Sequence, residues 1–398
     1  MAGPARRYSL AFPARISITH GHMANISEPL SPAFIGAAAV RGDLLVRIRR
    51  SAEYVAIPVF ALVVSSVLFS VFLLALGKSP VEFFELVHRG GFGTAFSIQN
   101  TLQRSAPLIL TALAVAVPAR IGLIMIGGEG ALVLGGFAAA VVAIPLVRGH
   151  VPPPVTLIVM VAMGTLAGAL WVGLAGYLRH ARGVNETISS LLLTYIGIAI
   201  MNFFVEGPLR DLTNPNKPST MPIGDAYMVG KLPGTDVHWG FAAGIVLAIV
   251  LYVLLSRTTF GFAVRISGGN PRAALAQGLP VGKLIVLSCL LAGACAGLAG
   301  FFEVAAIQGR ANASLVAGYG FTGILVAFLA RHNPLAIIPV AILFGGIVAS
   351  GGLVQRRMDL PDATVLVLQG LTFVVLLVSE TLYGRFKIFQ VSGTADRT

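Results

Sequence analysis

The residues best suited to chemistry in this sequence are ionisable groups set inside apolar segments. The clearest is Glu129, which lies in "GGEGALVLGG". A carboxylate removed from water is costly and marks a functional site by default. The flanking glycines can break a helix, so that backbone amides and the carboxylate line a polar cavity. The alternative is structural: Glu129 caps a helix or pairs with Arg120 or Arg104 to hold a broken helix in place.

Catalytic signatures are absent from the sequence. The stretch "GLPVGKL" lacks the four-residue gap of a phosphate-binding loop, and Lys283 is followed by Leu284. No "HExxH" or "GxSxG" pattern occurs. Cys289 and Cys295 lie in one apolar run without metal-type spacing. We therefore expect no enzymatic activity, no metal site and no cofactor bound by this chain.

The segments that carry these residues have the composition of membrane helices. Hydrophobic residues make up 56% of the chain, charged residues 11%, and the mean hydropathy is +0.86. The run from Tyr54 to Leu76 exceeds the roughly 20 apolar residues that cross a bilayer. Short segments of alternating polarity, as in a membrane barrel, are missing. The sequence therefore predicts an all-α polytopic membrane protein, and its 46 glycines favour close helix packing.

About ten transmembrane helices are expected. Most of the 28 Lys and Arg residues fall on segments that this arrangement places on the cytoplasmic side, which predicts that both termini are cytoplasmic. The same rule explains the net charge of +12, and because no binding module is recognisable we expect no nucleic-acid partner. The second and third spans are interrupted by Pro118, Arg120 and "GGEG", so one of them can be broken or re-entrant. The expected spans are 54–76, 97–118, 121–146, 156–178, 188–206, 239–256, 284–305, 315–330, 334–354 and 362–383.

The remaining segments divide the chain further. Residues 1–50 are interpreted as a flexible basic cytoplasmic tail without a signal peptide, and Met23 is an alternative start. Residues 51–390 form the membrane domain. Within it, 206–238 is rich in proline and is predicted to be a long irregular outer loop, suited to docking a protein outside the membrane.

The cytoplasmic loop 257–283 contains a short helix signal in "GFAVRISGGNPRAALAQGLPVGK". Asn270 can cap a helix that begins at Pro271, and Gly278 can end it. A helix of two turns is unstable alone, so it must dock either on this protein or on a separate cytoplasmic subunit. Charged contacts and close approach are offered by Arg265, Arg272, Ala273 and Ala274.

Four segments together resemble the permease subunits of ABC importers for simple sugars and nucleosides, which are related to the ribose and branched-chain amino-acid permeases. The resemblance implies that the loop helix couples to an ATPase subunit, with Gly269, Asn270, Pro271 and Gly278 as the matching residues. It also implies ATP and Mg²⁺ on that ATPase, a second and different permease chain, and an extracytoplasmic binding protein or lipoprotein. The four segments are "IGLIMIGGEGALVLGGFAAAVV" at 121–142, "GVNETISSLLLTYI" at 183–196, the loop at 261–283, and "GYGFTGILVAFLARHNPLAIIPVAILFGG" at 318–346.

The chain departs from the family pattern at three positions. The family commonly has amide side chains where Met125, Ala131 and Thr194 stand. These positions lie near the expected pathway, so the cargo can differ from the better-known sugars and nucleosides.

Polar side chains in the spans predict a translocation pathway. A buried amide or hydroxyl either lines such a path or joins two helices by a hydrogen bond. Glu303 is expected near the outer end of its span, where it reaches water or pairs with Arg310. "GGEGALVLGG" and "GYGFTGILVA" both set glycines before an apolar run and can be corresponding elements of two halves. The candidate pathway residues are Asn100, Gln103, Glu129, Thr194, Tyr195, Asn202, Tyr319 and Thr322.

Two functional hypotheses follow. The first is the permease subunit of an ABC importer in a bacterial inner membrane, surrounded by lipid, which passes a small polar solute and is driven by a separate ATPase. The second is an autonomous secondary carrier that uses Glu129 as the ion-coupling carboxylate. An intramembrane enzyme would need a nucleophile or metal cluster, and the sequence has neither.

Overall fold

The computed structural model describes residues 36–213, 217–361 and 363–380, with side chains from residue 56 onward. The chain divides into two compact units, and the second, Glu53–Gln390, contains nearly all described residues. Most of the predicted tail, the alternative start at Met23 and both chain termini lie outside the described residues, so the cytoplasmic placement of the termini stays a prediction.

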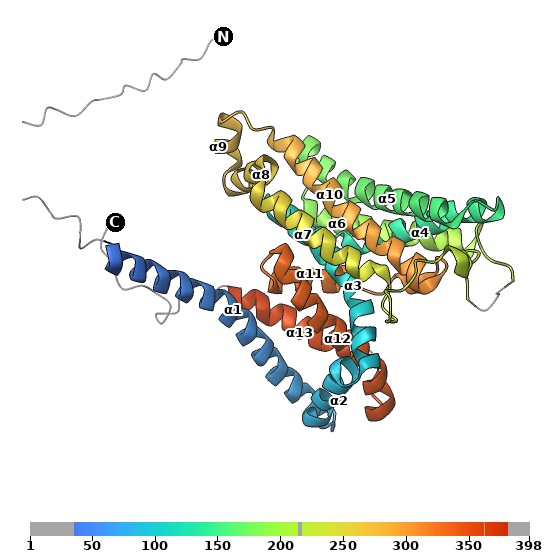
Figure 1. The fold of residues 1–398 in the computed structure, drawn as a ribbon, viewed down its shortest axis with the longest axis horizontal. Coiled ribbons are helices and arrows are strands. Elements are labelled where there is room, and N and C mark those ends of the chain that lie inside the picture. The colour runs from blue at the N-terminus through green and yellow to red at the C-terminus, as the bar shows by residue number, and fades with distance from the viewer. Residues whose placement is uncertain (1–35, 214–216, 362, 381–398) are drawn as a thin grey trace, which may run out of the picture. The chain divides into compact units, whose positions relative to one another are not determined.

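The second unit is an all-α membrane bundle, which confirms the predicted fold class (Figure 1). Among the described residues, eight helices are long and apolar enough to cross a membrane, and two shorter apolar helices stand where the eighth and tenth spans were expected. The long helices are α1 (Gly36–Ala75, with its apolar part at Ala56–Ala75), α3 (Ala95–Ala119), α4 (Gly128–Arg148), α5 (Pro153–Arg182), α6 (Glu186–Glu206), α7 (Trp239–Arg257), α10 (Val281–Phe302, continued by a π-helical turn at Glu303–Gln308) and α12 (Pro334–Met358); the shorter ones are α11 (Tyr319–Leu329) and α13 (Ala363–Glu380).

Two helices were not predicted. Helix α2 (Pro80–Phe92) begins where the Ser79 hydroxyl accepts a hydrogen bond from the Glu82 amide, with proline at the first helical position. Its buried Phe83 packs against α1, α12 and α13. Helix α8 (Thr259–Gly269) continues from α7 into the coupling loop.

The third span was expected at 121–146, with a break near "GGEG" left open, and residues 121–127 are not helical. The helix of the third span begins only at Gly128. Gly122 adopts a positive φ of 81°, the Leu123 amide donates back to the Pro118 carbonyl, and Ile124 and Ile126 bond to α6. The Thr187 hydroxyl donates to the Ile124 carbonyl, and the Ile126 amide donates to the Ser190 hydroxyl. We call residues 120–127 the connector.

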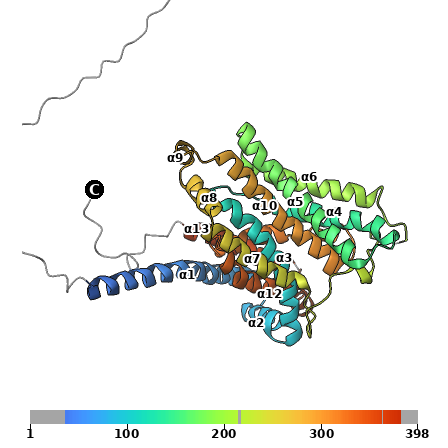
Figure 2. The same ribbon diagram turned by 45° about the horizontal axis from the view of Figure 1, so that its top comes forward.

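Helices α4, α5 and α10 lie side by side (Figures 1 and 2) and touch through glycine backbone. A Cβ atom at Gly168 of α5 would collide with the carbonyl oxygen of Gly293 and lie 2.6 Å from Cα of Gly297 in α10. A Cβ atom at Gly135 of α4 would lie 2.5 Å from the same Cα of Gly297. Both α5 and α10 carry the small-xxx-small spacing that lets membrane helices approach this closely, Gly164 with Gly168 and Gly293 with Gly297.

Candidate functional site

Helices α4 and α11 begin next to each other inside the bundle. Helix α4 starts at Gly128, after the connector, and α11 starts at Tyr319, after the loop 309–318. Their first turns are in backbone contact, because a Cβ atom on Gly320 would overlap the Glu129 amide and lie 2.8 Å from the carbonyl carbon of Gly128. The two glycine segments noted in the sequence therefore begin two half-helices whose N-termini face one another.

The meeting point lies well inside the bundle. Gly135 of α4 contacts Gly164 of α5, the antiparallel neighbour. From Gly164, α5 continues to its end at Arg182, which is roughly 27 Å away at 1.5 Å per residue. On the same side of this contact, α4 extends from Gly135 only to its start at Gly128, roughly 10 Å away. From here α4 runs toward the outer loop, where Arg148 contacts Met221. Helix α11 runs in the opposite sense, toward the side of the coupling loop.

Glu129 joins the two half-helices. Its side chain is fully buried, and its two carboxylate oxygens accept hydrogen bonds from the backbone amides of Gly318 at 2.7 Å and Gly320 at 2.5 Å. It thus stands in the first turn of α4 while capping the first turn of α11. A carboxylate is favourable at a helix N-terminus because the unpaired amides carry partial positive charge, and here two such ends meet. This geometry matches the structural alternative of a capped broken helix, whereas Arg120 bonds elsewhere.

A second polar cluster lies beside this point, between α3, α11 and the end of α10. Arg104 of α3 donates to the Asn100 amide oxygen at 3.4 Å and lies within electrostatic range of the buried Tyr319 hydroxyl. Glu303, only 3% exposed, lies within electrostatic range of Arg104 and of Glu129. It belongs to the π-helical turn of α10, a distortion that frequently occurs at functional sites.

The expectation that Glu303 reaches water or pairs with Arg310 is wrong. The carboxylate is buried, and Arg310 donates instead to the Ser219 hydroxyl at 3.4 Å. One oxygen, Oε1 of Glu303, has no hydrogen-bond partner. The π-helical turn rotates this residue toward the bundle interior, which a regular apolar period does not anticipate.

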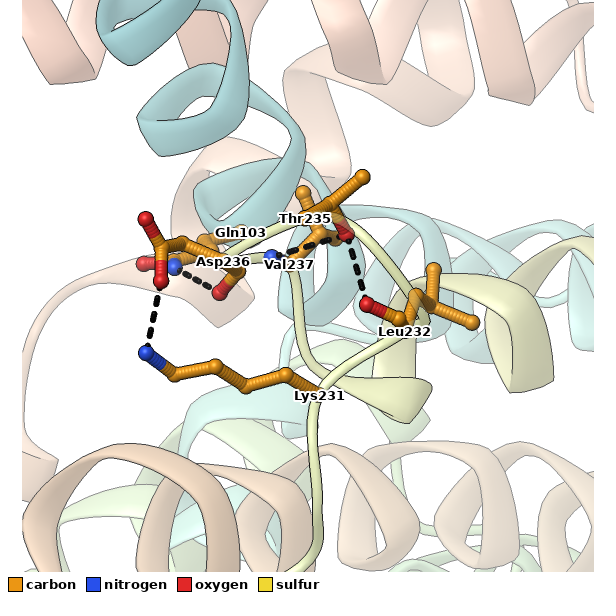
Figure 3. Close-up of polar contacts among 6 residues, drawn as sticks. All are labelled: Gln103, Lys231, Leu232, Thr235, Asp236 and Val237. Atoms are coloured by element: carbon orange, nitrogen blue, oxygen red, sulfur yellow. Dashed lines mark hydrogen bonds and ion pairs between the residues drawn. The ribbon is translucent and has the colours of Figure 1, made fainter.

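The other predicted pathway residues are dispersed. Gln103 lies at the outer loop, where its amide donates to the Asp236 carbonyl at 2.5 Å beside the Lys231–Asp236 ion pair (Figure 3). Thr322 donates to the Gln369 side chain at 2.9 Å and so joins α11 to α13. On α6, Thr194 packs against Gly130, Tyr195 is exposed and Asn202 is half-buried. The structure therefore groups Asn100, Glu129 and Tyr319, and not the remaining five.

The coupling loop forms the expected local structure. The Asn270 side chain accepts hydrogen bonds from the Arg272 and Ala273 amides, both at 3.1 Å, and α9 (Pro271–Ala276) follows. Gly278 ends this segment with a φ of 81°. Arg272, Ala273, Leu275 and Gly269 are exposed, whereas Ala274 is buried against the chain itself.

Helix α8 anchors this loop on the connector. A Cβ atom on Gly268 would collide with the Arg120 carbonyl and lie 3.0 Å from Cα of Ile121, so only glycine permits the contact. Arg265 of α8 is exposed and donates to the Leu255 carbonyl at the end of α7, at 3.3 Å. Figures 1 and 2 show α8 and α9 together at the ends of α7 and α10.

Arg120 connects the connector to the end of α11. Its guanidinium donates to the His332 carbonyl at 2.8 Å, in the turn between α11 and α12. Burial and the nearby Arg265 charge lower the pKa of Arg120. Burial, together with the charges of Arg120 and Arg331, lowers the pKa of His332 to about 4, so this imidazole is neutral near neutral pH.

Several of these residues were missed as site residues. Arg104 and Glu303 carried a signal, since an ionisable residue inside an apolar run is a functional candidate. Gly268 and His332 carried none, because only the folded chain brings them to Arg120.

Helices α4 and α11 with facing N-termini inside a membrane bundle, polar groups beside them and a capped helix exposed at one end define a membrane transport subunit. The chain belongs to the family described as branched-chain amino acid transport system / permease component, which matches residues 97–377. It is accordingly a multi-pass inner-membrane permease subunit of the ABC type and not itself an enzyme.

Relatives of known assignment support the same family. The chain is 32% identical to a glucose ABC transporter permease protein of Haloferax volcanii, over 85% of this chain and 90% of that protein. It is 28% identical to a nucleoside ABC transporter permease protein of Lactococcus lactis, over 73% and 82% of the two chains. It is 27% identical to a guanosine ABC transporter permease protein of Bacillus subtilis, over 84% and 95%.

Proposed function

We propose that this chain forms the translocation path for a sugar or nucleoside and that a separate cytoplasmic ATPase drives it through α9. ATP and Mg²⁺ would bind on that ATPase. A second permease chain and an extracytoplasmic binding protein or lipoprotein complete the proposed importer. The autonomous carrier that uses Glu129 gains no support from the three relatives described above, which are ABC transporter permease proteins.

The exposure of α9 carries the proposal. A helix of six residues lies far below the length that is stable alone in water, yet it is capped at Asn270 and held rigid between α8 and α10. Only Ala274 of this helix is buried, so Arg272 and Leu275 are left for a partner. A preorganised surface of this kind loses little conformational entropy on docking.

The polar cluster supports an uncharged cargo. It combines the Glu303 carboxylate, the Arg104 guanidinium, the Tyr319 hydroxyl and the Asn100 amide, so acceptors and donors are both present. A sugar hydroxyl is both donor and acceptor and fits such a set. An anionic solute would be repelled by the carboxylates of Glu303 and Glu129, and a cationic solute would be repelled by the guanidinium of Arg104.

The test is purification of the chain from its native membrane in mild detergent, with mass spectrometry of the proteins that co-elute. We expect an ATPase, and we expect Arg272→Glu to abolish its recovery. Arg357→Glu is the matched control, because it reverses an equally exposed arginine at the far end of α12. Repeated recovery of an active chain without any ATPase would refute the proposal.

Cargo is tested with inside-out and right-side-out vesicles that contain the purified complex. Uptake of labelled glucose, guanosine, glutamate and lysine is compared. We expect transport of glucose or guanosine and exclusion of the charged solutes, with uptake reduced in Glu303→Gln. Transport of glutamate or lysine in preference to the neutral solutes would contradict the proposed cargo class.

A further inference from the structure

The connector, α4, α11 and the α11–α12 turn form a closed ring of contacts. Starting at Arg120, the connector leads into α4, and Glu129 of α4 binds the amides of Gly318 and Gly320 at the start of α11. Helix α11 then runs to His332, whose carbonyl accepts a hydrogen bond from Arg120 at 2.8 Å. Arg120 therefore ties the start of the connector to the C-terminal end of α11, while Glu129 ties together the N-termini of α4 and α11.

The coupling loop touches this ring at the same residue. Gly268, in the last turn of α8, lies against the Arg120 carbonyl and the Ile121 backbone. A Cβ atom on Gly122 would in turn lie 3.5 Å from the carbonyl oxygen of Gly268. Backbone packed on backbone leaves no side chain that can rearrange to absorb a shift of α8. A displacement of α8 must therefore reach Arg120 and Ile121.

We propose that Gly268 and Arg120 are positioning residues that transmit movement of the coupling loop to both half-helices at once. The inference rests on the proposed function, since it assumes that an ATPase moves α9. Because Arg120 holds the connector and the α11–α12 turn together, the two half-helices shift as one unit around Glu129. This opens or closes the neighbouring cluster of Arg104, Glu303 and Tyr319.

The wedge variant is Gly268→Ala, which inserts a methyl group between α8 and the connector. Gly370→Ala is its control, because it adds the same methyl group to a helix outside the coupling loop, where no atom lies within 4 Å of the position of that Cβ. Arg120→Gln is the second variant. It removes the hydrogen bond to His332 without adding volume. If Gly268→Ala fails to accumulate in the membrane, Arg120→Gln alone tests whether the connector transmits the movement.

The readout is independent of the cargo. Ala317→Cys places a reporter on the exposed residue just before α11, and the natural Cys289 and Cys295 are buried. The complex with its co-purified ATPase is labelled with a water-soluble maleimide, with and without Mg-ATP and vanadate. ATPase recovery and ATP hydrolysis are measured on the same samples.

In the parent protein and in Gly370→Ala, we expect ATP to change the labelling rate. In Gly268→Ala and Arg120→Gln, this change should shrink roughly tenfold while the ATPase stays bound and active. The inference would be overturned if ATP changed the labelling rate of both variants as much as that of the parent protein. It would also be overturned if ATP did not change the labelling rate of the parent protein while the ATPase was bound. Loss of ATPase binding in Arg120→Gln would also overturn it, since Arg120 would then act at the docking surface. Absence of any ATPase from the parent preparation would instead overturn the proposed function itself.

Discussion

Replacing Glu129 by glutamine should loosen the junction of α4 and α11. The carboxylate accepts from two backbone amides at 2.7 and 2.5 Å, in a site without solvent exposure. A glutamine offers one acceptor oxygen, and its NH₂ group would face the other amide donor. One charge-assisted bond is lost and one buried amide is left unpaired.

The magnitude follows from these two effects. A hydrogen bond to a charged group contributes about 1.5–3 kcal/mol, and an unpaired buried donor costs about 1–3 kcal/mol. The loss of negative charge at two helix N-termini adds to this. We expect destabilisation of about 3 kcal/mol, which corresponds to a decrease in Tm of roughly 3–4 °C for a chain of this size.

Thermal unfolding in mild detergent, followed by scanning fluorimetry, measures the effect. Glu206→Gln is the control, because Glu206 is an exposed residue at the end of α6 and its substitution should leave Tm unchanged. Gly320→Ala should be worse than Glu129→Gln, since its Cβ would overlap the Glu129 amide. If Glu129→Gln melts at the same temperature as the parent protein, the carboxylate does not hold the half-helices together and the reasoning is refuted.

Three further predictions concern other parts of the bundle. Gly297→Val should destabilise the protein by about 3 kcal/mol through overpacking against α4 and α5, whereas Gly370→Ala, which meets open space, should be neutral in the same melting assay. Asn270→Ala should weaken ATPase recovery without altering Tm, because the cap of α9 contributes about 1 kcal/mol locally; unaltered recovery would show that α9 needs no cap to dock. The pKa of His332 is about 6.5 in the unfolded chain and about 4 in the folded protein. Protonation of this imidazole therefore does not reduce the free energy of unfolding above pH 6.5. As the pH falls toward 4 it reduces that free energy, by about 2 kcal/mol at pH 5. His332→Asn tolerates the same positive φ of 53° and should remove this part of the acid sensitivity measured by Tm against pH; an unchanged profile would contradict the assignment.

The helices were predictable where the local signal is strong. Long apolar runs predicted nine of the ten membrane helices to within a few residues, and Asn270, Pro271 and Gly278 predicted α9, because caps and breakers act over short range. The connector was not predictable, since its apolar composition fits a helix. Its backbone follows α6 only because Ser190 and Thr187 supply hydrogen bonds from a distant part of the chain.

The candidate site shows the same division. Glu129 was identifiable from its charge inside an apolar run, but its partners Gly318 and Gly320 were not, because backbone amides have no sequence signature. Glu303 was misplaced because the sequence does not reveal the π-helical turn that points it inward. Gly268 meets Arg120 only through the tertiary packing of α8.

The glycine contacts among α4, α5 and α10 bear on the order in which the chain is assembled. Helices α4 and α5 are adjacent in the sequence and leave the ribosome together, whereas α10 follows only after α6, α7 and the coupling loop. Until it arrives, the α5 backbone at Gly168, whose neighbours all belong to α10, faces lipid. Because α10 packs against this backbone without side chains, no substitute helix of ordinary composition can take its place. Insertion of α10 is therefore the step that commits the nascent bundle to its final packing.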